Sequence, residues 1–365
     1  MHRRRKLAFI KLRKHPLTEK SFALQGMGTL YRRGTRSMHG LIICHLTESV
    51  TVNDVSLFLR LFFRSSLYSK FDILFIFNSS SALVFDNVIR RENDLFLNLL
   101  TRFKQLNRSD ENVKSSFDGV HFMKLREKEK ESEEIIWGKR VGNVSELTRL
   151  SYGSVIGFEV DEFDSENSLS GFMDHVPMSL RRWACYTMLL GRVRRSFKYT
   201  MLVDLKEVLL LGDPLGRVNN KSPESIYLST FPTLNKHGKR NSELSQVSPS
   251  IIFGGARGIR RLSNAMLIEI VRTAMQRKRK NSVSESGVLS QLVKNEYFLK
   301  NVKLTVTTEL TPEASSLNSA GSLSNYTVLR RGNNNIDMVQ IHLLIKFMKH
   351  VCSFPLHSLV YNNDC

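Results

Sequence analysis

Residues 197–215 read FKYTMLVDLKEVLLLGDPL, and this is the most informative stretch of the sequence. An apolar run over 199–203 stops abruptly at Asp204, a second acid follows at Glu207, and an Asp-Pro turn closes the segment at 213–214. Apolar runs bounded by turns are typical of strands buried in a mostly parallel sheet. Ligands of open α/β sheets bind beyond the carboxyl ends of such strands. Asp204 is therefore placed either to hold a divalent cation or a ribose, or to cap a short turn.

Segments on both sides of this stretch predict the rest of the sheet. Residues 41–44 and 71–77 are apolar, and helical spacing over 55–62 follows a capping box at Thr51 and Asp54. Strand, helix and strand in this order indicate a right-handed parallel crossover. Further strands are expected at 154–160, 225–231, 250–253 and 303–307, and further helices at 86–106, 181–195, 262–275 and 285–293. We predict an α/β domain over 40–310 with a Rossmann-type, mostly parallel central sheet flanked by helices, between a basic tail (1–39) and a loosely ordered extension (311–365).

The composition is that of a folded, strongly basic protein. The chain has 365 residues, of which 41% are hydrophobic and 24% are charged, so it is expected to fold. Lys and Arg outnumber Asp and Glu by 54 to 34, which gives a net charge of +20. This charge favours anionic partners, namely nucleic acid, a membrane surface or phosphate-bearing small molecules. The basic clusters are short and lack interleaved aromatic residues, so a solvated basic surface accounts for most of them.

The cysteines give no sign of a metal centre. None forms a Cys-x-x-Cys pair, so a zinc site of the usual spacing is not expected. Cys44 and Cys185 lie in apolar surroundings and are expected to be buried free thiols. Cys352 and Cys365 are close enough in sequence to pair in an oxidising compartment. No run of 18 apolar residues occurs, which predicts no transmembrane helix, and the apolar part of the N-terminus is too short for a secretory signal.

Three pieces of the chain carry the candidate chemistry. They are the carboxylates Asp204 and Glu207, the pair Gly254 and Gly255 at a strand end, and Glu285 at a helix start. In a parallel sheet all three are able to converge on one edge. Paired glycines let a ligand approach the backbone closely. Carboxylates that bind Mn²⁺ or Mg²⁺ would neutralise a diphosphate leaving group.

Each candidate also has a structural interpretation. The two glycines suit a simple turn, and Glu285 fits a capping box that begins at Ser282. Arg182 is able to bind a phosphate or to lie in solvent. His45 and His175 have no partner at metal-ligand spacing, so neither is assigned as a ligand.

Several of these segments resemble known families. GTLYRRGTRSM (28–38), RRWACYTMLLGRVRR (181–195), GGARGIRRLSNAML (254–267) and SVSESGVLSQLVKNEYFLKNV (282–302) resemble a family of uncharacterised plant proteins, over residues 27–365. VDLKEVLLLGDPL (203–215), with the helix before it, resembles the metal and nucleotide segment of GT-A-fold glycosyltransferases. This second resemblance implies a GT-A-like fold and a nucleotide-diphosphate sugar donor. It also implies a location in the Golgi or secretory pathway, whereas the absence of a signal or anchor predicts a cytosolic protein if the chain is complete.

The resemblance assigns roles to the candidates. It implies that Asp204 contacts ribose or metal, that Glu207 completes the metal site, that Gly254 and Gly255 line the acceptor side, and that Glu285 is a base or acceptor contact. Arg182 and Lys206 join the donor-binding set. The Asp-x-Asp pattern of the GT-A family is here Asp204-Leu205-Lys206, so a lysine stands where a metal ligand is usual. This departure speaks against Mn²⁺ or Mg²⁺ dependence.

Three functions follow from these observations. We expect a glycosyltransferase-like protein that uses a nucleotide-diphosphate sugar and a glycan or protein acceptor. The alternative is a catalytically degenerate relative that keeps the fold and binds a nucleotide sugar or a protein partner, and Lys206 favours it. A basic nucleic-acid-binding protein is a further alternative that rests only on the net charge of +20.

Overall fold

The computed structural model describes the central part of the fold. The described residues are 21–22, 29–30, 39–46, 49–77, 82–106, 155–159, 178–193, 197–218, 222–234, 240–276, 284–295, 299–307, 311–312, 326–331, 349 and 360. His175, Cys352 and Cys365 lie outside these residues. Cys44 and Cys185 are buried free thiols, as the sequence predicts.

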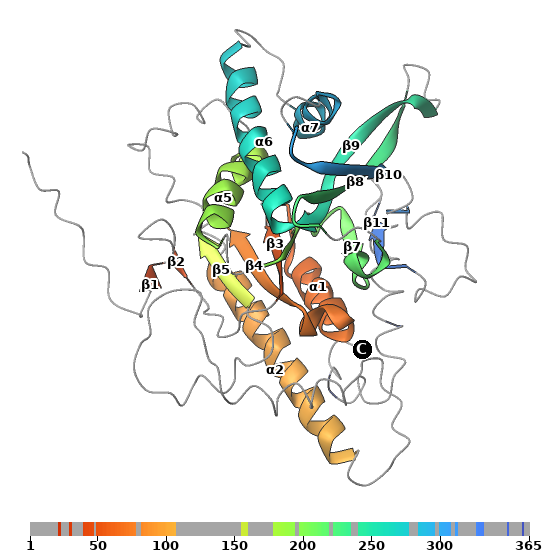
Figure 1. Cartoon of the computed structure of the whole chain (residues 1–365). Helices are drawn as coiled ribbons and strands as arrows, with labels where there is room; N and C mark the ends of the chain where they lie inside the picture. The colour runs from red at the N-terminus through yellow and green to blue at the C-terminus, as the bar shows by residue number, and fades with distance from the viewer. Residues whose placement is uncertain are drawn as a thin grey trace, which may run out of the picture.

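The described residues form strands and helices in alternation (Figure 1). The strands are β1 (Ser21–Phe22), β2 (Thr29–Leu30), β3 (Gly40–His45), β4 (Phe71–Phe77), β5 (Val155–Glu159), β6 (Tyr199–Val203), β7 (Val208–Leu210), β8 (Ser225–Leu234), β9 (Arg240–Gly255), β10 (Lys303–Thr307) and β11 (Val328–Arg330). The helices are α1 (Val52–Arg64), α2 (Ala82–Leu106), α5 (Met178–Arg192), α6 (Ala256–Gln276) and α7 (Glu285–Lys294), with 3₁₀ turns η2 (Ser66–Ser69) and η5 (Pro214–Arg217). Each predicted strand and helix is confirmed, with shifted ends, and β1 and β2 extend the sheet from within residues 1–39.

The predicted capping box starts α1. The Thr51 hydroxyl accepts a hydrogen bond from the Asp54 amide, and the Asp54 carboxylate accepts one from the Thr51 amide at 2.9 Å. These reciprocal bonds satisfy amide groups that a helix start leaves without partners. Asp54 also pairs with Arg331 of the segment that follows β11, so this helix start is tied to the C-terminal part of the fold.

The main sheet has nine strands in the order β1-β2-β5-β4-β3-β6-β9-β8-β10. Strands β5, β4, β3, β6, β8 and β10 point in the same direction, which confirms the predicted α/β class with a mostly parallel central sheet. Strand β9 is antiparallel to both of its neighbours, β6 and β8, and this reversal was not predicted. Strands β7 and β11 form a separate antiparallel pair.

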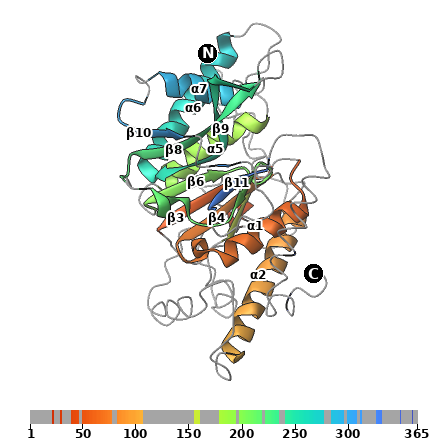
Figure 2. The same ribbon diagram turned by 90° about the vertical axis from the view of Figure 1, so that its right-hand side faces the viewer.

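Helices cover both faces of the sheet, with α1 and α2 on one side and α5 and α6 on the other (Figures 1 and 2). Strand β3 shows how the two cores are separated, because Ile42 and Cys44 pack toward α1 and α2 whereas Leu41 and Ile43 pack toward α5 and α6. Alternate residues of a strand point to opposite faces, so a strand covered on both sides is apolar throughout. No helix in the described part of the chain has the length and apolarity that a membrane span requires.

Candidate functional site

Asp204 lies directly after β6, at the carboxyl end of the parallel strands, and its side chain serves two purposes. Its Oδ1 accepts a hydrogen bond from the Lys206 amide at 3.0 Å, and its backbone oxygen accepts bonds from the Glu207 and Val208 amides. Its amide donates to the Ser250 carbonyl oxygen of β9 at 2.8 Å. The structure therefore confirms that Asp204 caps a turn. This cap uses Oδ1 and leaves the second carboxylate oxygen, Oδ2, for another contact.

That second oxygen meets Arg182, which joins the two predicted acids. Arg182 belongs to α5 and is 5% exposed, so it is not the solvated basic residue considered above. Its Nη1 lies 3.3 Å from Asp204 Oδ2, whereas its Nε and Nη2 donate to the two oxygens of Glu285 at 2.9 and 2.5 Å. A two-pronged arginine–carboxylate pair is among the strongest ionic hydrogen bonds in proteins. We call Asp204, Arg182 and Glu285 the arginine clamp.

Glu285 is held in the arginine clamp from a second direction as well. The Trp183 indole donates to Glu285 Oε1 at 2.6 Å, and Trp183 itself is 1% exposed in the core between α5 and α6. The predicted capping box at Ser282 is wrong. The N-cap of α7 is Ser284, whose hydroxyl accepts from the Gly287 amide, and Glu285 is the first residue of the helix. The Glu285 carboxylate therefore does not cap the helix and points toward α5.

Burial and charge oppose each other at Arg182. Burial alone would lower the pKa of Arg182, but the charges of Glu285 and Asp204 hold this pKa above its ordinary value, so the guanidinium stays charged. The cation in turn acts on His45 at the end of β3. Burial, followed by repulsion from Arg182, lowers the pKa of His45 to about 3, so this imidazole is neutral at pH 7. Its Nδ1 is buried and has no hydrogen-bond partner among the described residues.

A polar hollow of about 260 Å³ lies beside the arginine clamp. Its lining residues come from the β6–β7 turn, from β8, β9 and β11, and from the start of α7: Glu207, Phe231, Ser248, Pro249, Ser284, Glu285, Ser286 and Arg330. The Arg330 guanidinium sits 4.9 Å from the centre of the Phe231 ring, a cation–π geometry. We call this space the clamp pocket.

Sequence reasoning missed several residues of the clamp pocket. The sequence did not single out Arg330, yet β11 brings it beside Glu207, whose backbone oxygen accepts from the Arg331 amide at 2.7 Å. The only available signal was the short apolar run before Arg330, which lies in the segment predicted to be loosely ordered. Ser248 comes from the polar half of β9, which has no apolar alternation to mark it as a strand.

Glu207 is the third carboxylate of this region and is not part of the arginine clamp. Its side chain is exposed, but it borders the clamp pocket, where partial desolvation and then the charge of Asp204 raise its pKa. A carboxyl group that borders a pocket and has a raised pKa is a candidate for proton transfer.

The predicted metal ligands do not fit a divalent cation. Mn²⁺ and Mg²⁺ require several free oxygen ligands. Asp204 Oδ2 faces a guanidinium and its Oδ1 accepts a backbone amide, which leaves Glu207 alone. The described residues contain no cluster of three His, Cys, Asp or Glu side chains at metal-binding distance.

Gly254 and Gly255 lie away from this site. Because β9 is antiparallel to β6, they pair with Thr200 and Tyr199 at the start of β6, opposite to the end that carries Asp204. The expected convergence of the glycines with Asp204 is thus wrong. Their role is close packing, since a side chain at Gly254 would overlap the Ser225 carbonyl oxygen of β8.

A family model, the Domain of unknown function (DUF7780), matches residues 21–310. No curated protein matches the chain. The matched region contains the whole arginine clamp, whereas Arg330 of the clamp pocket lies beyond it.

Proposed function

The chain belongs to the DUF7780 family, and we propose that it is a GT-A-like protein that binds a nucleotide-diphosphate sugar without a metal ion. The observation that carries this proposal is the arginine clamp, in which one buried guanidinium sits between Asp204 and Glu285. In the proposed site, Arg182 holds Asp204 and Glu285 in place without a metal ion, and Arg330 is the cation that lines the clamp pocket.

The position of the site supports a nucleotide ligand. Asp204 follows the carboxyl end of β6, the place where ligands of open α/β sheets bind. The clamp pocket beside it offers hydrogen-bonding hydroxyls at Ser248, Ser284 and Ser286 and a cation at Arg330. Its volume of about 260 Å³ is suited to one end of such a ligand rather than to all of it.

Different lining residues are suited to different parts of the ligand. Glu207 is placed to accept hydrogen bonds from ribose or sugar hydroxyls. Arg330 and the amino end of α7 favour the negative charge of the diphosphate. Lys206, whose amide is already bound to Asp204, is a second basic residue in the β6–β7 turn.

A second candidate function is sugar transfer itself, and the raised pKa of Glu207 favours it. In this reaction an acceptor hydroxyl oxygen forms a bond to the anomeric carbon, the bond from that carbon to the diphosphate breaks, and the acceptor proton moves to Glu207. The nucleoside diphosphate leaves as the anion. Glu285 is assigned to the arginine clamp rather than to proton transfer, because its two oxygens already accept three hydrogen bonds.

Thermal-shift titration of the full chain with UDP- and GDP-sugars, in EDTA and in Mn²⁺, tests the binding proposal. A ligand of the folded state at a hundred times its Kd adds about 2.7 kcal/mol of stability, which for a chain of 365 residues corresponds to a rise in Tm of roughly 3–4 °C. We expect this rise for at least one donor in EDTA and its loss in Arg330→Met, because Arg330 is the cation that lines the clamp pocket. The matched control is Arg257→Met, whose guanidinium pairs with Glu224 near the start of β8.

The outcomes separate the alternatives. A rise that requires Mn²⁺ would overturn the proposal of binding without a metal ion. The absence of a rise with every donor would overturn the binding proposal. Release of sugar or nucleoside diphosphate that falls about a hundredfold in Glu207→Gln, with donor binding retained, would establish transfer.

A further inference from the structure

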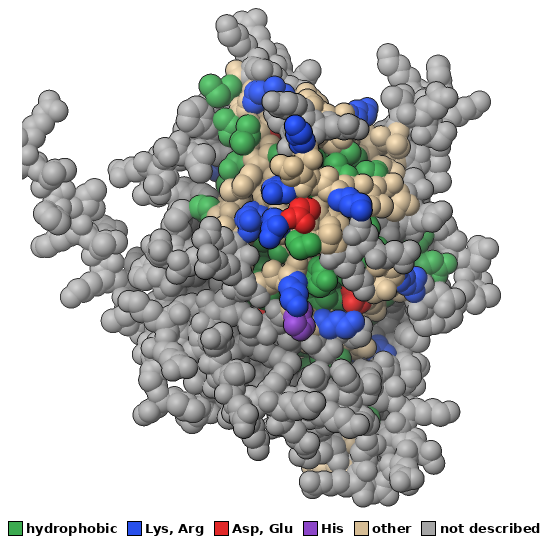
Figure 3. Space-filling model, in the orientation of Figure 1, with side chains coloured by type: hydrophobic (Ala, Val, Ile, Leu, Met, Phe, Trp, Pro, Cys, Tyr) green, Lys and Arg blue, Asp and Glu red, His purple; other side chains and the backbone are tan. Residues whose placement is uncertain are grey.

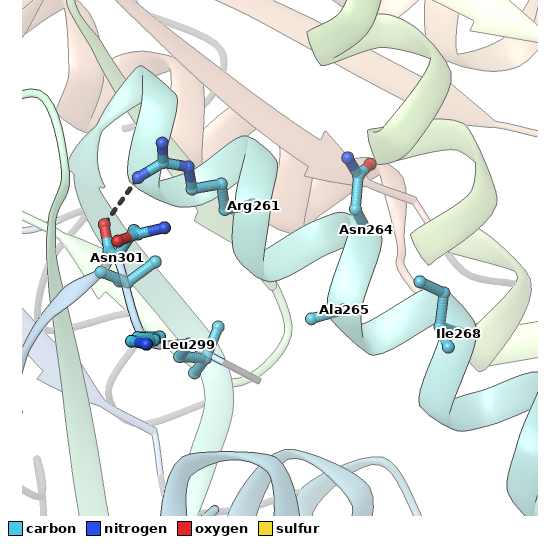
Figure 4. Close-up of a pocket in the computed structure, with 8 residues that line it drawn as sticks. Arg261, Asn264, Ala265, Ile268, Leu299 and Asn301 are labelled. Atoms are coloured by element: carbon cyan, nitrogen blue, oxygen red, sulfur yellow. Dashed lines mark hydrogen bonds between the residues drawn. The ribbon is translucent and has the colours of Figure 1, made fainter. Parts of the chain in front are cut away.

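A second hollow, of about 480 Å³, lies between α6 and the segment that precedes β10 (Figure 4). Its floor is aliphatic and consists of Ala265 and Ile268 from α6 and of Leu299 and Val302 from the segment before β10. Ile268 is 64% exposed, although a side chain of this size is ordinarily buried. We call this space the α6 groove.

Helix α6 has two apolar stripes. Ile259, Leu262, Met266 and Ile270 recur at helical spacing, are fully buried, and account for the packing of α6 on the sheet. A second stripe carries Ala265, Ile268 and Met275, and Met275 is 66% exposed. At 100° per residue these three positions fall on one side of the helix, away from the buried stripe. Ala265 packs partly against the buried core, whereas the packing of α6 on the sheet does not explain the exposed Ile268 and Met275.

The rim of the α6 groove is positively charged. Arg261 donates from Nη1 to the Asn301 carbonyl oxygen at 2.6 Å, which fixes its guanidinium at the rim, and Lys300 is exposed on the other side. Asn264 and Asn301 add side-chain amides, and no acidic residue is among the described residues that line the groove. Figure 3 shows Lys and Arg side chains among hydrophobic ones on the face of the molecule that carries α6 and β10.

We propose that the α6 groove is a docking site for an acidic peptide segment of a partner protein that presents aliphatic side chains. The aliphatic floor and exposed Ile268 would bury one or two of those side chains, and Arg261 and Lys300 would pair with the flanking carboxylates. A symmetric contact with a second copy would bring these same cations together. Nucleic acid would leave the aliphatic floor without a role, since single strands stack on aromatic rings and the described lining has none.

The α6 groove is separate from the clamp pocket. Residues 299–302 directly precede β10, whose first residue pairs with Ser225 at the start of β8, so the groove borders the amino ends of these parallel strands. Asp204 lies at the carboxyl end of β6. The docking proposal therefore stands or falls independently of nucleotide-sugar binding.

Fluorescence anisotropy of labelled peptides with the full chain tests the docking proposal. The probe is a fluorescein-labelled peptide of about 15 residues that contains Glu, Ala and helically spaced Leu, and its twin carries Lys in place of Glu. We expect saturable binding of the acidic peptide and not of the basic one. Ile268→Ser and Lys300→Glu should each weaken the binding about tenfold.

The control is Val84→Ser, which changes the exposed Val84 of α2, a residue outside the groove. It should leave the affinity unchanged, and all variants should keep the far-UV circular dichroism of the unmodified protein. The proposal is overturned by equal binding of both peptides, by no binding of the acidic one, or by an equal loss in Val84→Ser. A labelled single-stranded oligonucleotide that binds where the peptide does not would assign the groove to nucleic acid. A dimer in light scattering that Ile268→Ser dissociates would assign it to a second copy.

Discussion

Replacing Arg182 by methionine isolates the arginine clamp. Methionine retains much of the aliphatic bulk of the arginine and removes its charge. The Arg182 side chain is 6% exposed, and the side chains of Asp204 and Glu285 are 15% and 13% exposed, so little water is available to compensate them. Removing one partner of a buried ion pair costs about 3–5 kcal/mol, because the remaining charge is buried alone. Here two carboxylates lose one cation, and the costs overlap because they share it. We expect a loss of about 4 kcal/mol in the free energy of unfolding at pH 7.

Urea unfolding followed by circular dichroism measures this loss at pH 7 and again at pH 5. Acid protonates the two orphaned carboxylates, so the deficit of Arg182→Met should shrink at pH 5. The double variant Arg182→Met/Glu285→Gln removes one of the orphaned charges and should recover about 1–2 kcal/mol. The control is Arg257→Met, whose side chain is 54% exposed and pairs with Glu224, with an expected change within about 0.5 kcal/mol.

Two results would refute the reasoning about the arginine clamp. The first is a loss in Arg182→Met that is no larger than the loss in Arg257→Met. The second is a large loss that is the same at both pH values and is not recovered by Glu285→Gln, because the missing packing of the arginine stem would then explain it.

The remaining predictions concern His45 and the glycines. Because burial lowers the pKa of His45 to about 3, the unfolded chain binds a proton that the folded chain rejects. Its contribution to stability is complete above the unfolded pKa of about 6.5 and falls by about 2 kcal/mol at pH 5, and His45→Asn should abolish this part of the slope in urea titrations. Gly254→Ala should cost about 2 kcal/mol in the same assay, since the new methyl group meets the Ser225 carbonyl oxygen. Gly191→Ala in α5, where the space is open, should be neutral or stabilising, and an equal loss at both glycines would contradict the packing role of Gly254.

The parallel part of the sheet was predictable because each strand is buried on both faces. Every residue of β3 is buried, which requires the continuous apolar run that the sequence shows at 41–44. The capping box at Thr51 was predictable for a local reason, since its two hydrogen bonds join residues only three positions apart.

Strand β9 was recognised, but its direction was not. An apolar run such as 250–253 has the same pattern whichever way the strand points, so only the connection before it carries directional information. The predicted gap between 231 and 250 was long enough for a parallel crossover. In the structure β8 extends to Leu234 and β9 begins at Arg240, and so short a connection permits only an antiparallel hairpin. The residues that extend β8 and β9 are mostly polar, so the sequence did not indicate the hairpin. Because the direction of β9 was not recognised, the predicted position of Gly254 near Asp204 was also wrong.

The arginine clamp was beyond sequence reasoning for a different reason. Arg182 and Glu285 are 103 positions apart, and their meeting depends on how α5 and α7 pack. Locally, Glu285 fits a helix start equally well with Ser282 or with Ser284 as the N-cap, and the two alternatives turn its carboxylate in different directions. Tertiary packing on Trp183 decides between them.

The arginine clamp also determines which interactions a cation would have to break in order to bind Asp204. A divalent ion that used Asp204 would have to displace both the Lys206 amide from Oδ1 and the Arg182 guanidinium from Oδ2. Arg182 would then keep only its two bonds to Glu285, although in the structure the two carboxylates share this one buried cation. Separating Arg182 from Asp204 would therefore cost the contribution of one ion pair in a largely buried site. Under the proposed function, the diphosphate of a nucleotide sugar would not have to break these bonds, because its oxygens would accept hydrogen bonds from Arg330 and from the amino end of α7.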